Sequence, residues 1–182
     1  MLPRMLSAFA LLKERMPGLK AMVSACPALP ASLYKKIIGG APVGVFEGHL
    51  REMLGRADIA LVTSGTATLE TALLGVPHVI TYHTSLITYA LMRQLVKAPF
   101  IGLPNIIAGK ALVPECIQER AEPAHLAAAV SRFIESPQDY DRTANALVAL
   151  REKLGEKKPS VEVSAIIRGL LSPQPPVESA RQ

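Results

Sequence analysis

The arrangement that most constrains the fold is a regular alternation of short apolar segments with segments of helical periodicity. The apolar segments are continuous runs, which are typical of parallel strands covered by helices on both faces. They lie at 19–25, 42–47, 58–64 and 77–82, and a fifth begins at 99 before becoming a loop that ends at 109. Strands that alternate with helices favour right-handed βαβ units. We therefore predict an α/β fold with a Rossmann-like, doubly wound parallel sheet.

Helical segments fill the intervals between the predicted strands. The predicted helices are 3–16, 29–38, 49–57, 66–74, 85–97, 122–136, 137–154 and 160–171. We expect residues 1–172 to form one domain and residues 173–182 to be a disordered tail. A doubly wound domain usually opens on a strand and its phosphate loop, but this chain opens on a helix. Either the domain is built differently, or its first strand lies outside this chain.

Composition narrows the classes of partner. A net charge of +5 suits a ligand with phosphates or an anionic membrane surface. Aromatic residues make up 4% and no basic run occurs, so we do not expect nucleic acid as a partner. Cys26 and Cys116 form no C-x-x-C pair, which favours a reducing, cytoplasmic compartment. The spacing of the four histidines fits no metal site, and no apolar run reaches the ~18 residues of a membrane span.

The stretch SGTATLE at 64–70 has the composition of a ligand site at the end of a strand. Ligands of open α/β sheets bind at the carboxyl ends of the strands, where Ser64 is expected. Gly65 permits a close backbone approach, and the N–H groups at the start of the next helix favour a phosphate. Glu70 would then accept hydrogen bonds from a ribose diol. A phosphate loop followed by a carboxylate indicates a nucleotide-sugar site.

A purely structural interpretation of the same stretch is equally open. The pattern S/T-x-x-E is also a capping box, with Thr66 or Ala67 near the cap and Glu70 close to the third helical position. Short motifs carry a high risk of false positives, so the pattern by itself leaves both interpretations standing.

A second polar cluster spans residues 103–118 and includes Asn105, Lys110, Glu115 and Gln118. It follows a predicted strand end and could reach the same crevice. An ordinary loop with an Asn turn and a Pro-started helix is the favoured interpretation of the cluster by itself.

Taken together, these segments resemble the carboxyl-terminal half of bacterial lipid-A-disaccharide synthases. The resemblance rests on SGTATLE followed by LLGVP at 73–77, on LVK at 95–97, and on LPNIIAG at 103–109 leading into LVPE and Gln118. It is near-continuous from about residue 57 to residue 120 and looser over 3–25. It implies an inverting glycosyltransferase with two Rossmann-like domains, of the GT-B type, acting in lipid A biosynthesis.

The resemblance also implies substrates and residue roles. Such enzymes transfer diacylglucosamine from its UDP donor onto diacylglucosamine 1-phosphate and release UDP, with no cofactor and no metal ion. The backbone of Ser64, Gly65 and Thr66 would hold the pyrophosphate, and Glu70 the ribose. The remaining substrate-binding positions implied by the family's motifs are Asn105, Glu115 and Gln118.

This chain departs from the family pattern in its length, since members are roughly twice as long. The resemblance implies that the amino-terminal acceptor domain, its catalytic carboxylate and a basic Gly-Ser-Arg loop before Leu2 are missing. The catalytic residue is therefore unknown, because no side chain here has a good claim to deprotonate the acceptor. His49, His78 and His83 are expected to be structural or surface groups.

Several interpretations of the whole chain remain open. It is a donor-binding half, a related sugar-nucleotide enzyme such as an epimerase, or an inactive, partner-dependent remnant. The resemblance implies a partner carrying the amino-terminal half and a homodimer formed by exchange of helices within 137–171. It further implies a peripheral location on the inner face of the inner membrane. For the segment 85–97, a core-facing helix is favoured over contact with lipid.

Overall fold

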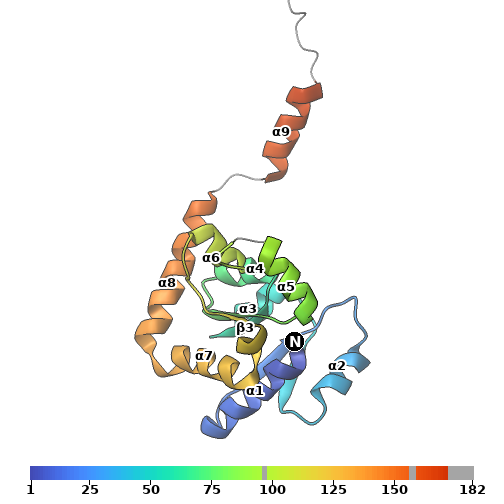
Figure 1. The fold of residues 1–182 in the computed structure, drawn as a ribbon, viewed down its shortest axis with the longest axis vertical. Coiled ribbons are helices and arrows are strands. Elements are labelled where there is room, and N and C mark those ends of the chain that lie inside the picture. The colour runs from blue at the N-terminus through green and yellow to red at the C-terminus, as the bar shows by residue number, and fades with distance from the viewer. Residues whose placement is uncertain (96–97, 156–158, 172–182) are drawn as a thin grey trace, which may run out of the picture. The chain divides into compact units, whose positions relative to one another are not determined.

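The computed structural model describes residues 1–95, 98–155 and 159–171 (Figure 1). The chain divides into two compact units, Met1–Arg151 and Glu152–Gln182. The first unit holds the strands and nearly all the helices, and the second contains the last helix. The expected tail at 173–182 lies outside the described residues. No helix among those residues is long and apolar enough to cross a membrane.

The order of elements follows the predicted alternation through the first four strands. The strands are β1 (Ala21–Ser24), β2 (Val43–Phe46), β3 (Ala60–Thr63), β4 (His78–Tyr82) and β5 (Glu115–Ile117). The helices are α1 (Leu2–Arg15), α2 (Ala31–Ile38), α3 (Leu50–Leu54), α4 (Thr66–Leu73), α5 (Leu86–Leu95), α6 (Leu103–Ala108), α7 (Pro123–Glu135), α8 (Pro137–Leu154) and α9 (Pro159–Leu171). A short 3-10 helix, η1 (Gln118–Ala121), links β5 to α7.

The strands are parallel, which confirms the predicted α/β class. In the described part of the chain they form two sheets, one of order β1-β2 and one of order β3-β4-β5. In the second sheet Thr63 lies beside Thr81, and Thr81 lies beside Cys116. The carboxyl ends of β3, β4 and β5 therefore meet at one edge, which we call the carboxyl edge.

Helices cover both faces of the three-stranded sheet. On one face α1 and α7 pack together over Val79 and Cys116, with Leu12 and Leu126 in the same apolar cluster (Figure 1). On the other face Ile80 packs with residues of α4 and α8. Because β4 has a strand on each side and helices on each face, its residues from His78 to Thr81 are all buried. This burial explains the continuous apolar pattern of that strand.

Two expectations about local structure were wrong. The segment from residue 99 does not form the fifth strand, because helix α6 starts at Leu103 with Pro104 in its first turn, and the fifth strand is Glu115–Ile117. Proline is well accommodated in the first turn of a helix, where its missing N–H has no intrahelical partner anyway. The expected core-facing position of residues 85–97 is also wrong where the side chains are described. Leu86, Ile87 and Leu91 of α5 are 76%, 77% and 57% exposed.

Candidate functional site at the carboxyl edge of the sheet

The turn between β3 and α4 presents an open backbone to solvent. Gly65 is the N-cap of α4 and has φ 156° and ψ −169°, a conformation that side-chain-bearing residues rarely adopt. A Cβ built on Gly65 would have no atom within 4 Å, so the surrounding space is free. Thr66, the first residue of the helix, is exposed. The start of α4 can therefore be approached closely by a ligand.

The capping-box interpretation of SGTATLE was wrong, and Glu70 is left without that role. Helix α4 has no side-chain cap, and its first turn is instead closed by Thr68, whose Oγ1 donates to the carbonyl of Gly65 at 2.7 Å. Glu70 lies beyond the first turn and is exposed. Its carboxylate has no hydrogen bond or ion pair with any residue that the structure describes. It is free to accept hydrogen bonds from a ligand lying against α4.

Glu115 organises the segment between α5 and α6. Its Oε2 accepts from the amide of Ile101 at 3.0 Å, and its Oε1 accepts from the amide of Gly102 at 3.0 Å. Asn105 Nδ2 donates to the same Oε1 at 2.9 Å. With these three donors, the carboxylate holds the backbone at 101–102 next to the first turn of α6. A Cβ on Gly102 would lie 2.1 Å from Ile80 Cδ1, so the backbone passes directly over the sheet there.

Asn105 is fully buried, and the protein uses all its hydrogen-bonding capacity. Besides the bond to Glu115, Nδ2 donates to the carbonyl of Val113 at 2.9 Å. Oδ1 accepts from the amides of Leu112 and Val113 at 2.7 and 3.1 Å. The structure thus places Asn105 and Glu115 in one cluster that fixes the loops on either side of α6. Both side chains have protein partners, and Asn105 is fully buried whereas Glu115 is half-buried.

Ser64 connects this cluster to the turn at Gly65. Its Oγ donates to the carbonyl of Ile101 at 3.3 Å, and its amide donates to the carbonyl of Thr81 on β4 at 3.0 Å. The side chain of Ser64 is therefore engaged, and its position is set by two neighbouring segments. Ser64, Asn105 and Glu115, which are up to 51 positions apart, are joined through the backbone at 101–102.

The side chain of Gln118 holds the loop after β4 in position. Its side-chain amide forms a closed pair with the backbone of Thr84, accepting from the amide at 2.8 Å and donating to the carbonyl at 3.1 Å. Gln118 has φ 53°, and it is the non-glycine residue with positive φ among those described. Such a conformation costs about 1–3 kcal/mol and persists where the surroundings impose it. The pair ties the ends of β4 and β5 together at the carboxyl edge.

Two substitutions at Gln118 separate the side-chain clamp from the backbone strain. We expect Gln118→Ala to lower the free energy of unfolding by about 2–3 kcal/mol, because it removes both bonds to Thr84 and keeps the positive φ. Gln118→Gly also removes the bonds but relieves the strain, so it should cost about 1 kcal/mol less. Chemical denaturation followed by circular dichroism measures both values. Equal losses for the two variants would show that the left-handed backbone is unstrained.

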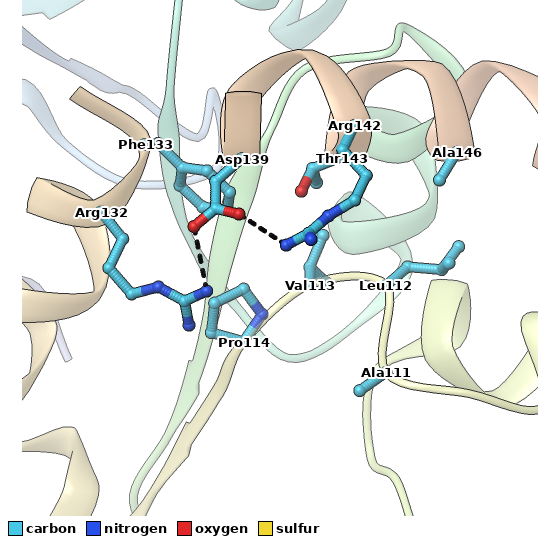
Figure 2. Close-up of a pocket in the computed structure, with 10 residues that line it drawn as sticks. All are labelled: Ala111, Leu112, Val113, Pro114, Arg132, Phe133, Asp139, Arg142, Thr143 and Ala146. Carbon is cyan, nitrogen blue, oxygen red and sulfur yellow. Dashed lines mark hydrogen bonds and ion pairs between the residues drawn. The ribbon is translucent and has the colours of Figure 1, made fainter. Parts of the chain in front are cut away.

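Two cavities of the first unit lie away from the turn at Gly65 and from Glu70. One, of about 300 Å³, is lined by residues 111–114 and by α7 and α8 (Figure 2). In this cavity Asp139 accepts hydrogen bonds from Arg132 at 3.2 Å and from Arg142 at 2.5 Å. Both guanidinium groups are therefore already paired with a carboxylate of the protein. Pro114 precedes β5, which puts this cavity at the opposite end of the strand from the carboxyl edge. The other, of about 340 Å³, lies beside α1 and contains Leu6, Lys13 and Pro42.

Two groups among the described residues have shifted pKa values, His78 and Cys116. Burial lowers the pKa of His78 from 6.5 to about 4, although the carbonyl of Val76, which Nδ1 faces at 2.9 Å, opposes this. Burial raises the pKa of the Cys116 thiol. His78 starts β4 at the amino end of the strand, and its role is structural, as expected. His49 and His83 are exposed.

Comparison with known protein families shows which family the chain belongs to. A family model described as lipid-A-disaccharide synthetase matches residues 1–166. The chain belongs to the lipid-A-disaccharide synthase family. This membership confirms the resemblance seen in SGTATLE and LPNIIAG, and it fits the parallel α/β architecture of a GT-B glycosyltransferase half.

Individual lipid-A-disaccharide synthases match over most of this chain. The enzyme of Dechloromonas aromatica is 36% identical over 139 residues, which are 76% of this chain and 36% of that enzyme. The enzyme of Geobacter metallireducens is 34% identical over 93% of this chain and 44% of its own length. For Sulfurihydrogenibium sp. the identity is 34%, over 93% of this chain and 47% of the relative. The chain therefore spans less than half the length of these synthases.

The backbone groups that hold the candidate site together leave little trace in the sequence. The amides of Ile101 and Gly102 and both backbone groups of Thr84 make the contacts that position Glu115 and Gln118. A glycine at 102, directly before LPN, was the available signal for a close approach. Thr84 carries no such signal, because any residue type can supply a backbone N–H and C=O.

Proposed function

We propose that this chain is the donor-binding half of a lipid-A-disaccharide synthase and that UDP binds at the carboxyl edge. One observation carries the proposal. The turn at Gly65 is open to solvent, and on the helix that it starts, Glu70 has no partner within the described structure. A helix N-terminus favours phosphate, and an unpaired carboxylate one turn farther on suits a diol. Family membership supports the same assignment.

The roles that we propose for individual residues depend on which side chains have no hydrogen-bond partner in the described structure. The amides at Gly65 and Thr66 would bind the pyrophosphate, and Glu70 would accept from the ribose hydroxyls. Asn105, Glu115 and Gln118 are bonded inside the protein, so we assign them to positioning the loops at 101–102 and 83–85. Between Glu70 and Glu115 the sequence contains no Asp or Glu, which leaves this region without carboxylates that would repel a diphosphate.

The proposed reaction joins two acylated sugars. Diacylglucosamine would pass from UDP to the 6-hydroxyl of diacylglucosamine 1-phosphate with inversion, and UDP would leave. Transfer requires a base that removes the proton of the acceptor hydroxyl. We assign that base to the acceptor-binding half of the enzyme, outside residues 1–182. The chain by itself should then bind UDP without forming disaccharide.

The role of Glu70 is tested by its removal. We expect UDP to bind to the folded chain and Glu70→Ala to weaken binding by about 1–3 kcal/mol, because the ribose hydroxyls lose a charged acceptor. Isothermal titration calorimetry with UDP measures this change.

The matched control is Glu14→Ala, which removes an exposed carboxylate near the carboxyl end of α1. It should leave UDP affinity unchanged. Loss of affinity in both variants would point to net charge rather than a specific contact. Absence of UDP binding at millimolar concentration, in a sample with native circular dichroism, would remove the proposed function.

We further propose that α5 lies against the cytoplasmic surface of the inner membrane. Its described apolar side chains Leu86, Ile87 and Leu91 are exposed, and the sequence around them carries Arg93 and Lys97 but no acid. Apolar groups with basic neighbours favour an anionic bilayer. We expect the chain to sediment with vesicles containing 30% phosphatidylglycerol, and Leu86→Ser with Ile87→Ser to reduce the bound fraction about tenfold. Equal binding of wild type and variant would exclude α5 as the contact.

A further inference from the structure

The cavity between α7, α8 and the segment at 111–114 combines an apolar lining with charged groups (Figure 2). Phe133 and Val113, which are 7% and 2% exposed, are among its apolar residues. Arg132, Asp139 and Arg142 are its charged residues. Ligand sites have this composition, in which a few directed polar groups lie within an apolar surface, and a volume of about 300 Å³ is enough for a small molecule.

A single carboxylate holds the two guanidinium groups of the cavity beside each other. Asp139 accepts from Arg132 through Oδ2 and from Arg142 through Oδ1 (Figure 2). Its own place is set at the start of α8, because its amide donates to Ser136 Oγ at 3.2 Å. A guanidinium carries several N–H donors, and within the described residues each of these two donates one of them, to Asp139. The remaining donors are available to a second acceptor.

The charge of the cavity lining is positive. Two guanidinium groups lie against one carboxylate, which leaves one positive charge in excess. The lining also includes the first turns of α8, where the helix dipole adds partial positive charge. Lys110 and Asp141, which adjoin lining residues in the sequence, carry opposite charges that offset each other. The cavity therefore favours an anion.

The hydroxyl of Thr143 gives independent evidence for a polar ligand. Thr143 is 7% exposed and lines the cavity, and its oxygen points from α8 into the space that the lining residues enclose (Figure 2). It forms no hydrogen bond with any residue that the structure describes. The buried Thr71 of α4, by contrast, donates to the carbonyl of Ala67 one turn earlier at 2.7 Å. A buried hydroxyl without a partner is costly, and an acceptor in the cavity would remove that cost.

The wall at 111–114 is already in place for a ligand. Asn105 Oδ1 accepts from the amides of Leu112 and Val113, and Asn105 Nδ2 donates to the carbonyl of Val113. The carbonyl of Pro114 accepts from the amide of Ile80 on β4 at 2.9 Å. These bonds tie the segment to α6 and to the sheet. A wall that is fixed beforehand does not have to be ordered when a ligand binds.

We propose that this cavity binds a phosphate monoester of a small polyol. The planar forks of Arg132 and Arg142 match the oxygens of a phosphate, and the hydroxyl of Thr143 donates to a third oxygen. The carbon skeleton of the ester lies against Phe133 and Leu112, since the volume corresponds to about ten water molecules. The cavity is at the opposite end of β5 from the carboxyl edge, so the inference is independent of UDP binding.

Titration followed by nuclear magnetic resonance of the backbone amides tests the site on the full chain. The probe is glycerol 3-phosphate, and glycerol at the same concentration is the control ligand. We expect the ester, and not glycerol, to shift the amide signals of Ala111, Thr143 and Ala146 at millimolar concentration. Arg132→Gln and Arg142→Gln should each weaken binding at least about tenfold, because each loses a charge-assisted hydrogen bond.

Two further variants separate specific contacts from general attraction. Thr143→Val nearly keeps the shape of the side chain but removes the hydroxyl, so it should weaken binding about threefold. Arg151→Gln removes an exposed arginine of α8 that does not line the cavity, and it should leave binding unchanged. Equal weakening in all three arginine variants would show attraction by net charge and overturn the proposal. Unshifted amide signals, in a chain that retains its native spectrum, would also overturn it unless phosphatidic acid is bound.

Vesicles distinguish a soluble ester from a lipid headgroup of the same chemistry. Phosphatidic acid carries its phosphate as a monoester, whereas phosphatidylglycerol carries a diester. If the ligand is a headgroup, the chain should bind phosphatidic acid vesicles more tightly than phosphatidylglycerol vesicles of equal surface charge, and Arg142→Gln should remove the difference. If the ligand is soluble, glycerol 3-phosphate should bind and the two kinds of vesicle should bind equally. Failure of glycerol 3-phosphate to bind, together with equal binding of the vesicles, would exclude the site.

Discussion

Asn105→Ala is expected to lower the free energy of unfolding by about 3–5 kcal/mol. The substitution leaves the amides of Leu112 and Val113 and the carbonyl of Val113 without their partner, and it removes one of the two hydrogen bonds that Glu115 Oε1 accepts. Val113 is 2% exposed, so water cannot readily replace these bonds. Each unmet buried group costs about 1–3 kcal/mol, and partial relaxation keeps the total below their sum. Denaturation in urea, followed by circular dichroism at 222 nm, measures the loss.

Asn145→Ala is the matched control for this prediction. Asn145 is exposed on α8, so its truncation should change stability by less than about 0.5 kcal/mol. A positioning role adds a second expectation: if Asn105→Ala remains folded at low temperature, its UDP affinity should fall together with that of Glu115→Gln. The two losses should not add, because both residues hold the same backbone segment at 101–102. An unfolding free energy within 1 kcal/mol of wild type would contradict the cluster.

Acidification is expected to destabilise the chain by about 3 kcal/mol through His78. The native pKa of His78 is about 4, while the unfolded value is 6.5. Above pH 6.5 the imidazole is neutral in both states and contributes nothing. Between pH 6.5 and 4 the unfolded chain binds a proton that the native chain does not, so stability falls as pH falls. Below pH 4 the loss is complete and constant.

The variant His78→Gln removes this titration. Its free energy of unfolding should depend less on pH between 4 and 6.5 than that of the wild type, by about 3 kcal/mol over the window. His125→Gln, at an exposed histidine on α7, is the control and should follow the wild type. Carboxylates that titrate in the same pH range contribute equally to all variants, so their contribution cancels when the free energies of unfolding are subtracted. Parallel curves for wild type and His78→Gln would show that His78 titrates normally in the folded protein.

The local pattern of apolar residues was sufficient to predict the elements that are buried along one or both faces. The continuous apolar run of β4 and the amphipathic periodicity of α1 and α7 predicted their type and approximate bounds, because burial on one or both faces leaves a direct imprint on composition. The three-residue strand β5 was missed for the opposite reason. Glu115–Ile117 is too short for a period, and its pairing with Ile80–Tyr82 is a contact between distant segments. Pro104 signalled a helix start that the apolar run at 99–109 obscured.

In the candidate site, too, some features follow from the sequence and others only from the tertiary structure. The sequence by itself determined the parallel α/β class, the family, and the residues SGTATLE that open a helix after a strand, because each rests on neighbours along the chain. The tertiary structure alone decided which of these residues are free. Glu70 has no described partner, whereas Asn105, Glu115 and Gln118 are bonded to protein segments up to 34 positions away. It also decided that the sheet is divided between β1 and β3. Hydrogen-bond pairing is a property of positions in space, and a linear pattern records only the residue types that supply it.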